Sequence, residues 1–272
     1  MGRSTSLPLL RLAGATALLL AAPLTLTACG GDGGNGGKKS EAKVGSTPAA
    51  AESSAAPESP IEAYPPEKVL EAGLEDFKVA KSVRVAGDFD DGGNPMRVDF
   101  RLGVDVADGT MQGSDKGRAV STKLRSVGGK VYMSGDAGFW ESMTGDKATG
   151  RLLGGRWVIV PAAETKDFKP FLGVRQFDEA MFKRFRKGLA SGSGGLTEGH
   201  ESLRGAPVFA IGPLAKKPVV YVAASGTPHL VRLQTSGLGG DVPDGGFDFT
   251  EYDAPLQIQA PADAIDIGKM GK

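Results

Sequence analysis

The amino-acid sequence predicts an α+β fold: a curled antiparallel β-sheet half-barrel of about ten strands, with helices packed on the concave face. Three observations predict it. Residues 96–106 alternate apolar and mostly charged side chains, which is typical of a strand with one dry and one wet face. Short strand-like segments recur before and after it, separated by loops that contain Gly, Pro or Asp. A helical stretch between them carries an apolar stripe, which can cover the dry face of the sheet.

The first 28 residues have the three parts of a secretory signal peptide: a basic start, an apolar run and small residues before a cut. The apolar run is shorter than the roughly 20 residues of a membrane-spanning helix, and Pro23 interrupts it. A permanent transmembrane helix is therefore the less favoured interpretation. Residues 26–29 read Leu-Thr-Ala-Cys, which resembles the lipobox of bacterial lipoproteins. The resemblance implies that Cys29 receives a diacylglyceryl group and that cleavage then exposes it.

Cys29 is the single cysteine of the 272 residues, so the chain forms no internal disulfide and no four-thiolate metal site. Residues 29–62 consist largely of small, polar and charged residues and cannot bury enough apolar surface to offset the entropy of ordering. We expect a lipidated cysteine and a disordered linker there, and one folded domain over residues 63–272. Basic and acidic residues number 32 each, which argues against a nucleic-acid-binding protein.

The first half of the domain is predicted to hold one helix and four strands. Residues 67–80 place four apolar side chains on one stripe of a helix. These are Val69, Leu70, Leu74 and Phe77. A strand begins at Val83 and ends before a turn over residues 90–95. The strand at 96–106 follows, and its apolar set faces the concave side while Arg97, Asp99 and Arg101 face water. Two more strands are expected at residues 119–127 and 130–134.

A helical insertion and about six further strands make up the second half. Residues 136–153 are expected to be helical in pieces, 156–160 to form a strand and 164–189 to form one or two helices. The apolar stripe of the last helix consists of Phe177, Met181, Phe185 and Leu189. Its basic side chains are Lys183, Arg184, Arg186 and Lys187, which form either a solvated face or a contact with anionic headgroups. The remaining strands are expected at residues 198–203, 207–211, 218–224, 229–235, 247–252 and 256–259.

The chain resembles the LppX and LprA/F/G family of actinobacterial lipoproteins. The resemblance lies in the lipobox at Cys29, the Val-Gly-Gly-Lys-Val-Tyr hairpin at 127–132 and the Gly-Arg-Trp-Val strand at 155–158. The late strands at 221–233 and 247–255 fit the same pattern. The resemblance implies a half-barrel sheet with helices across its hollow. It also implies binding of lipids or lipidated glycans in that hollow and their transfer through the envelope, without catalysis. The Gly-rich loops, such as 237–246, depart from the family pattern.

No arrangement of residues typical of catalysis or metal binding is apparent in the sequence. The two histidines, His200 and His229, fall on separate predicted strands. Ser191 and Ser193 follow a predicted helix, whereas a nucleophile elbow requires a preceding strand. The aspartates at 88–91 lack the ligand spacing and flanking helices of a calcium-binding loop. The sequence therefore predicts a protein that is not an enzyme and has no metal or cofactor.

Two functions remain open. The first is a monomeric lipoprotein, lipid-anchored on the extracytoplasmic face of the cell membrane, that binds an acyl lipid or glycolipid in an apolar cavity and carries it through the envelope. The predicted cavity-lining residues are Val98, Phe100, Leu102, Val104, Phe177, Met181 and Phe185. The alternative is a surface interaction or regulatory lipoprotein whose core is filled by its own side chains. The sequence does not separate the two, because the same alternation lines a filled core and an empty cavity.

Overall fold

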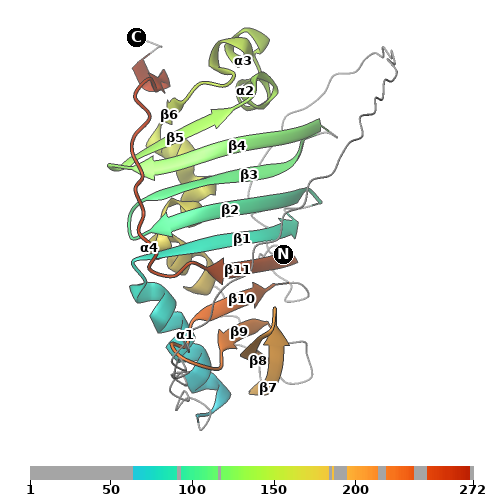
Figure 1. Cartoon of the computed structure of the whole chain (residues 1–272). Coiled ribbons are helices and arrows are strands. Elements are labelled where there is room, and N and C mark those ends of the chain that lie inside the picture. The colour runs from blue at the N-terminus through green and yellow to red at the C-terminus, as the bar shows by residue number, and fades with distance from the viewer. Residues whose placement is uncertain are drawn as a thin grey trace, which may run out of the picture. The chain divides into compact units, whose positions relative to one another are not determined.

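The computed structural model describes residues 64–90, 93–115, 118–183, 186, 195–213, 219–235 and 244–269. The predicted signal peptide, the predicted lipid-attachment residue Cys29 and the predicted linker lie outside the described residues. Within the described part, twelve strands form one sheet in the order β12-β6-β5-β4-β3-β2-β1-β11-β10-β9-β8-β7 (Figure 1). The two ends of this order are different strands, so the sheet is not closed. The α+β fold with a large, curled, unclosed sheet is confirmed, with twelve strands where the sequence predicts about ten.

Neighbouring strands are antiparallel except for β12 and β6, which are parallel. The central strands are β1 (Ser82–Asp90), β2 (Pro95–Gly103), β3 (Ala107–Asp115), β4 (Arg118–Val127) and β5 (Lys130–Gly135). The others are β6 (Val158–Val160), β7 (Leu196–Leu203), β8 (Ala206–Pro213), β9 (Val220–Ala223), β10 (Leu230–Gln234), β11 (Asp244–Thr250) and β12 (Ile265–Asp266). Because β11 pairs with β1, the late strands extend the sheet formed by the early ones.

Helices pack against the sheet at three places. Helix α1 (Pro66–Val79) contacts β7 to β10, and its four predicted apolar residues are buried. Helices α2 (Ala137–Thr144) and α3 (Lys147–Leu153) pack against each other at the end of β5. The third group consists of η2 (Ala162–Leu172), α4 (Val174–Phe177) and η3 (Asp178–Phe182) and lies behind the sheet in Figure 1. We call this group the cover. A last short helix is η4 (Ile267–Lys269).

The cover is more broken than the sequence predicts. Its first helix is of the 3₁₀ type and contains Pro170, which has no N–H to continue an α-helical ladder. The four-residue α4 then passes into a π-helix over Asp178–Phe182. Residues 184–185 and 187–189 of the predicted helix lie outside the described residues.

The strand predicted for residues 96–106 is correct only as far as Gly103. Val104, Asp105 and Val106 form the turn to β3, closed by the Gly103 N–H, which donates to the Val106 carbonyl at 2.7 Å. Val104 is 43% exposed there, so its predicted place on the dry face is wrong. Asp105 forms an ion pair with Arg175 of α4. The alternation continues through the turn in the sequence, but the backbone reverses at this point.

The sequence does not reveal β3, because Ala107–Asp115 has no run of alternating large apolar residues. The register pairs Gly109 with Phe100 of β2. A Cβ atom on Gly109 would overlap the Phe100 ring, so the glycine allows this ring to lie across the strand. An apparently polar segment is therefore a central strand, because its glycine accommodates an aromatic side chain from the neighbouring strand.

Residues 251–264 form an extended C-terminal crossing segment that connects β11 to β12 at the far side of the sheet (Figure 1). The Asp253 N–H donates to the Ser82 carbonyl at 2.9 Å, and Arg125 donates to the Gln259 carbonyl at 2.8 Å. The predicted strand at 256–259 lies in this segment but pairs with no neighbouring strand, so that prediction is wrong. Half-buried and exposed residues nevertheless alternate along the segment, because one of its sides packs against the sheet.

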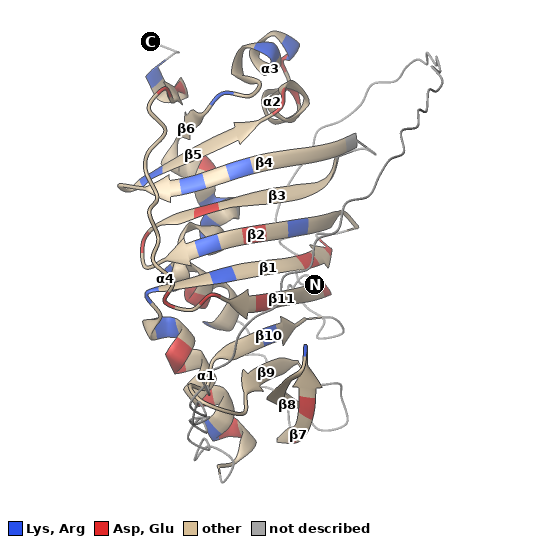
Figure 2. Cartoon of the chain, in the orientation of Figure 1, with Lys and Arg blue, Asp and Glu red and all other residues tan. Residues whose placement is uncertain are grey.

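The convex face of the sheet carries paired charges, seen as blue and red bands on the strands in Figure 2. Arg84 donates to Asp99 through Nε at 2.8 Å and through Nη2 at 2.7 Å. Arg97 pairs with Asp88 of the adjacent strand, and Arg101 pairs with Glu251. The prediction that Arg97, Asp99 and Arg101 face water is confirmed.

Candidate functional site

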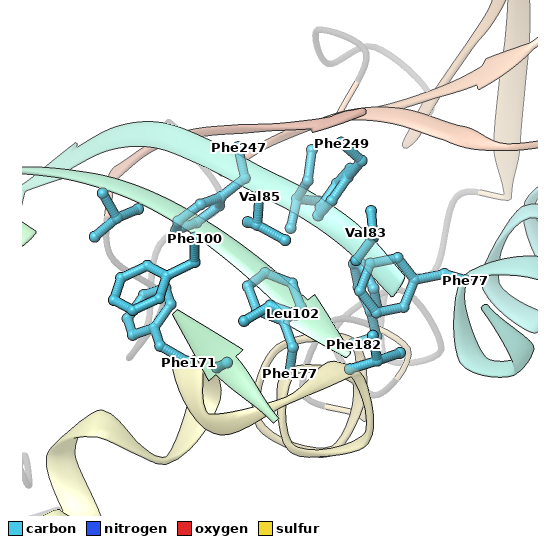
Figure 3. Close-up of a cluster of buried hydrophobic side chains, with 14 of the residues drawn as sticks. Phe77, Val83, Val85, Phe100, Leu102, Phe171, Phe177, Phe182, Phe247 and Phe249 are labelled. Atoms are coloured by element: carbon cyan, nitrogen blue, oxygen red, sulfur yellow. The ribbon is translucent and has the colours of Figure 1, made fainter. Parts of the chain in front are cut away.

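An aromatic cluster joins the concave face of the sheet to the helices (Figure 3). Phe177 of α4 is at its centre and is 0% exposed. Its ring centroid lies 5.6 Å from that of Phe77 in α1 and 5.6 Å from that of Phe182 in η3. The rings of Phe247 and Phe249 in β11 lie 5.9 and 5.8 Å away. The cover is therefore attached to the sheet and to α1 through aromatic side chains.

The structure brings four of the predicted cavity-lining residues into this buried region. Val98, Phe100 and Leu102 of β2 are at most 1% exposed, and so is Phe177. The Phe100 ring stacks on Phe171 of the cover at 4.9 Å, with 19° between the ring planes. These side chains contact one another across the interface between sheet and helices. That they line a ligand cavity stays a prediction.

The other predicted lining residues lie elsewhere. Met181 is half-buried at the edge of the core, Val104 lies in the exposed turn, and Phe185 lies outside the described residues. Phe182, which does not belong to the predicted stripe, is 1% exposed and occupies the inner position. The π-helix explains this difference, because its i→i+5 spacing brings Phe182 to the same side as Phe177.

A groove of about 510 Å³ lies between α1 and the start of β7. Its lining residues are Glu67, Leu70, Glu71, Leu74, Glu75, Arg186, Gly195 and Leu196. We call it the α1 groove. Leu70 and Leu74 form its floor and also belong to the hydrophobic core, with exposed fractions of 5% and 4%. The three glutamates stand four residues apart on α1, so they follow one line along the helix beside the leucines. The sequence predicts the leucines as core, but only the fold brings Leu196 opposite them.

The charges at the α1 groove are partly neutralised by neighbours. Lys68 donates to Glu71 at 2.6 Å, and this contact lowers the pKa of the Glu71 carboxyl. Arg186 pairs with Asp178 of the cover at 3.2 Å. Glu198 lies two residues beyond Leu196 on β7, and burial raises the pKa of its carboxyl. An apolar floor with an acidic rim results.

A histidine–aspartate pair fastens α1 to the sheet beside this groove. His229 Nδ1 lies 2.7 Å from Asp76 Oδ2 of α1. The His229 ring stacks on Tyr252 at 4.1 Å, and the Tyr252 hydroxyl donates to the Leu230 carbonyl at 2.9 Å. Burial raises the pKa of Tyr252 well above its usual range. The sequence places His229 only on a predicted strand, because its partners Asp76 and Tyr252 are distant from it along the chain.

Within the ranges that the structure describes, no group of three or more His, Cys, Asp or Glu side chains is placed to hold a metal ion. No helix in the described part of the chain has both the length and the apolar character to cross a membrane.

The structure, but not the sequence, resembles known proteins. No family model and no curated protein matches the sequence. The structure is similar to the crystal structure of LprF from Mycobacterium bovis, with a TM-score of 0.48. The two share 13% sequence identity, over 72% of this chain and 97% of that chain.

Proposed function

We propose that the protein is an extracytoplasmic lipoprotein, anchored through Cys29, whose domain binds an acyl lipid or lipidated glycan and carries it through the cell envelope. The observation that carries this proposal is the α1 groove, because its floor is continuous with the aromatic core. Its volume of about 510 Å³ falls within the range of small-molecule sites. Each methylene group that leaves water on such a floor contributes about 0.8 kcal/mol, which favours an alkyl chain.

The cover provides a route from this groove to the rest of the core. It consists of short helices of three types, and helices of this length are marginal without tertiary contacts. The cover contacts the sheet through aromatic side chains and is not part of the sheet's hydrogen-bonded ladder. A shift of α4 and η3 would therefore separate Phe177 from the sheet without breaking hydrogen bonds between strands. In the proposed lipid-bound state, the chain lies on Leu70 and Leu74 and extends toward Phe100 and Leu102 as the cover moves.

The predicted linker places the domain close to a source of lipid. About 35 flexible residues have a typical end-to-end distance on the order of 30 Å. Two acyl chains on Cys29 would hold the protein stably at the bilayer surface. The domain would then sample the outer leaflet without leaving the membrane.

The packing of the core favours a second candidate, an interaction or regulatory lipoprotein with no ligand. The stacked pair Phe100–Phe171 and the rings around Phe177 already bring the sheet and the cover into van der Waals contact. In this alternative, the cover stays closed and the surface of the domain binds another protein of the envelope.

Native mass spectrometry of the chain from residue 30 onward separates the two candidates. The protein is measured before and after exposure to membrane lipids. We expect acyl species to remain bound, and Leu196→Glu to reduce them because it places a charge in the α1 groove. Leu203→Glu is the matched control, since Leu203 is also half-buried on β7 but does not line the groove. An apo mass throughout would contradict lipid binding and favour the interaction protein.

A further inference from the structure

A second cavity lies on the convex face of the sheet, between β4, β5 and the helices α2 and α3. Its volume is about 590 Å³. Its lining residues are Ser121, Lys123, Ser134, Gly135, Asp136, Ala137, Arg151, Gly154 and Gly155. We call it the convex pocket. Lys123 is exposed while its neighbours Thr122 and Leu124 are buried, so the lysine faces away from the aromatic core. The convex pocket is therefore separate from the proposed lipid site.

Three parts of the chain build the convex pocket. On the sheet, Lys123 of β4 lies directly opposite Ser134 of β5 in the strand register. At the end of β5, Asp136 caps α2 by accepting a hydrogen bond from the Phe139 N–H at 2.7 Å. Behind α3, Gly154 lies so close to the start of α2 that a Cβ atom would come within 3.1 Å of the Ala137 nitrogen. The glycine brings the α3 end of the pocket against the α2 end.

The cations of this pocket differ from three arginines on the convex face. Arg84, Arg97 and Arg125 each form an ion pair with an aspartate on an adjacent strand. Lys123 and Arg151, by contrast, form no ion pair with any residue in the described part of the chain. Figure 2 shows Lys and Arg residues in blue on β4 and α3. Two cations without a carboxylate partner among the described residues therefore line one cavity.

We propose that the convex pocket binds a phosphate ester that carries hydroxyl groups. Lys123 and Arg151 supply the positive charge for the phosphate, and the Ser121 and Ser134 hydroxyls can donate to its oxygens. Asp136, whose Oδ1 is used by the cap, can accept a hydrogen bond from a ligand hydroxyl. No large apolar side chain lines the pocket, so it favours a polar ligand over an alkyl chain.

The phosphate ester can come from a soluble phosphorylated polyol or from the headgroup of an anionic phospholipid. Titration calorimetry on the full-length protein in neutral detergent tests the first source, with glycerol 3-phosphate, inorganic phosphate and glycerol as ligands. Co-sedimentation with vesicles of neutral phospholipid, with and without phosphatidylglycerol, tests the second. We expect saturable binding of the phosphate compounds or of the anionic vesicles, and none of glycerol.

The substitutions Lys123→Gln and Arg151→Gln should each weaken this binding about tenfold or more, because each removes a charge-assisted hydrogen bond. Both side chains lie on the surface, so thermal unfolding should stay close to that of the unmodified protein. Lys130→Gln and Lys147→Gln remove exposed lysines that do not line the pocket and should leave binding unchanged.

Two results would overturn the proposal. One is the absence of binding in both arms by a protein whose unfolding is normal. The other is an equal loss of binding in the pocket variants and the control variants, which would indicate general electrostatic attraction. Either result leaves acyl binding in the α1 groove untouched, since that site lies on the other face.

Discussion

Replacing Phe177 by alanine tests whether the interior between sheet and cover is packed. The ring is 0% exposed and lies within 6 Å of the rings of Phe77, Phe182, Phe247 and Phe249. Removing a buried phenylalanine side chain costs about 3–5 kcal/mol. Aromatic pairs contribute about 0.5–1.5 kcal/mol beyond burial, so we expect the upper part of that range. For a domain of this size, the melting temperature should fall by about 8–20 °C.

The free energy of unfolding is measured by urea denaturation, and the melting temperature by calorimetry. Phe89→Ala is the matched control, because Phe89 is half-buried and its ring lies 5.6 Å from Phe247 at the edge of the same core. Its loss should be clearly smaller. A loss below about 1 kcal/mol for Phe177→Ala would refute the packing argument, because such a value is typical of a side chain with room around it.

The same variant bears on the proposed function. A void left by Phe177 lies where the proposed acyl chain would extend, so lipid should bind the variant and restore part of its stability. A ligand at 100 times its dissociation constant adds about 2.7 kcal/mol. Rescue by a fatty acyl ligand, but not by its short-chain analogue, is the expected result. No rescue together with no binding to the unmodified protein would favour the interaction protein.

Three further predictions follow from other parts of the chain. Cys29→Ala should release the protein from the membrane fraction with an unchanged melting temperature, and recovery in carbonate-washed membranes would indicate a transmembrane helix instead. Gly109→Ala should lower the free energy of unfolding, measured in urea, because its Cβ atom overlaps the Phe100 ring. The hydrogen bond from Arg84 lowers the pKa of the Asp99 carboxyl. The pair therefore stabilises the fold fully at pH values above the usual pKa of aspartate, and this contribution is lost as the pH falls through the lowered pKa. Asp99→Asn should therefore reduce the acid dependence of unfolding, and an unaltered pH profile would contradict this.

Much of the sheet could be predicted from local patterns. The stripe of α1 and the outward charges of β2 follow directly from helical and strand periodicity. In each element one face is buried along the whole length, so the apolar residues recur at the regular spacing of a helix or a strand. The lipobox at Cys29 is likewise a local motif, and the prediction of lipid attachment depends on the sequence alone.

The errors occur where the alternation of residue types does not show the path of the backbone or the identity of the neighbouring strand. The turn at residues 104–106 interrupts an alternation that continues in the sequence, and β3 has few apolar residues because Gly109 accommodates the Phe100 ring. The segment at 256–259 alternates because one side leans on the sheet, although it forms no ladder. The π-helix moves Phe182 to the inner position expected for the stripe. The periodicity of apolar residues indicates which side of an element is buried, but it does not indicate which strand or aromatic ring covers that side.

The sequence by itself determined the fold class, the dry face of β2, the apolar stripe of α1 and the candidate lipid-attachment residue. Each of these depends on a pattern of residues that are close together along the chain. Tertiary structure decided the sites. The α1 groove needs Leu196 beside Leu74, and the convex pocket needs Arg151 beside Lys123. Each pair comes from elements that pairing and packing bring together from distant parts of the chain. The fold sets the neighbours of each side chain. It therefore decides whether a charged side chain has an ion-pair partner and whether a leucine side chain is accessible to a ligand.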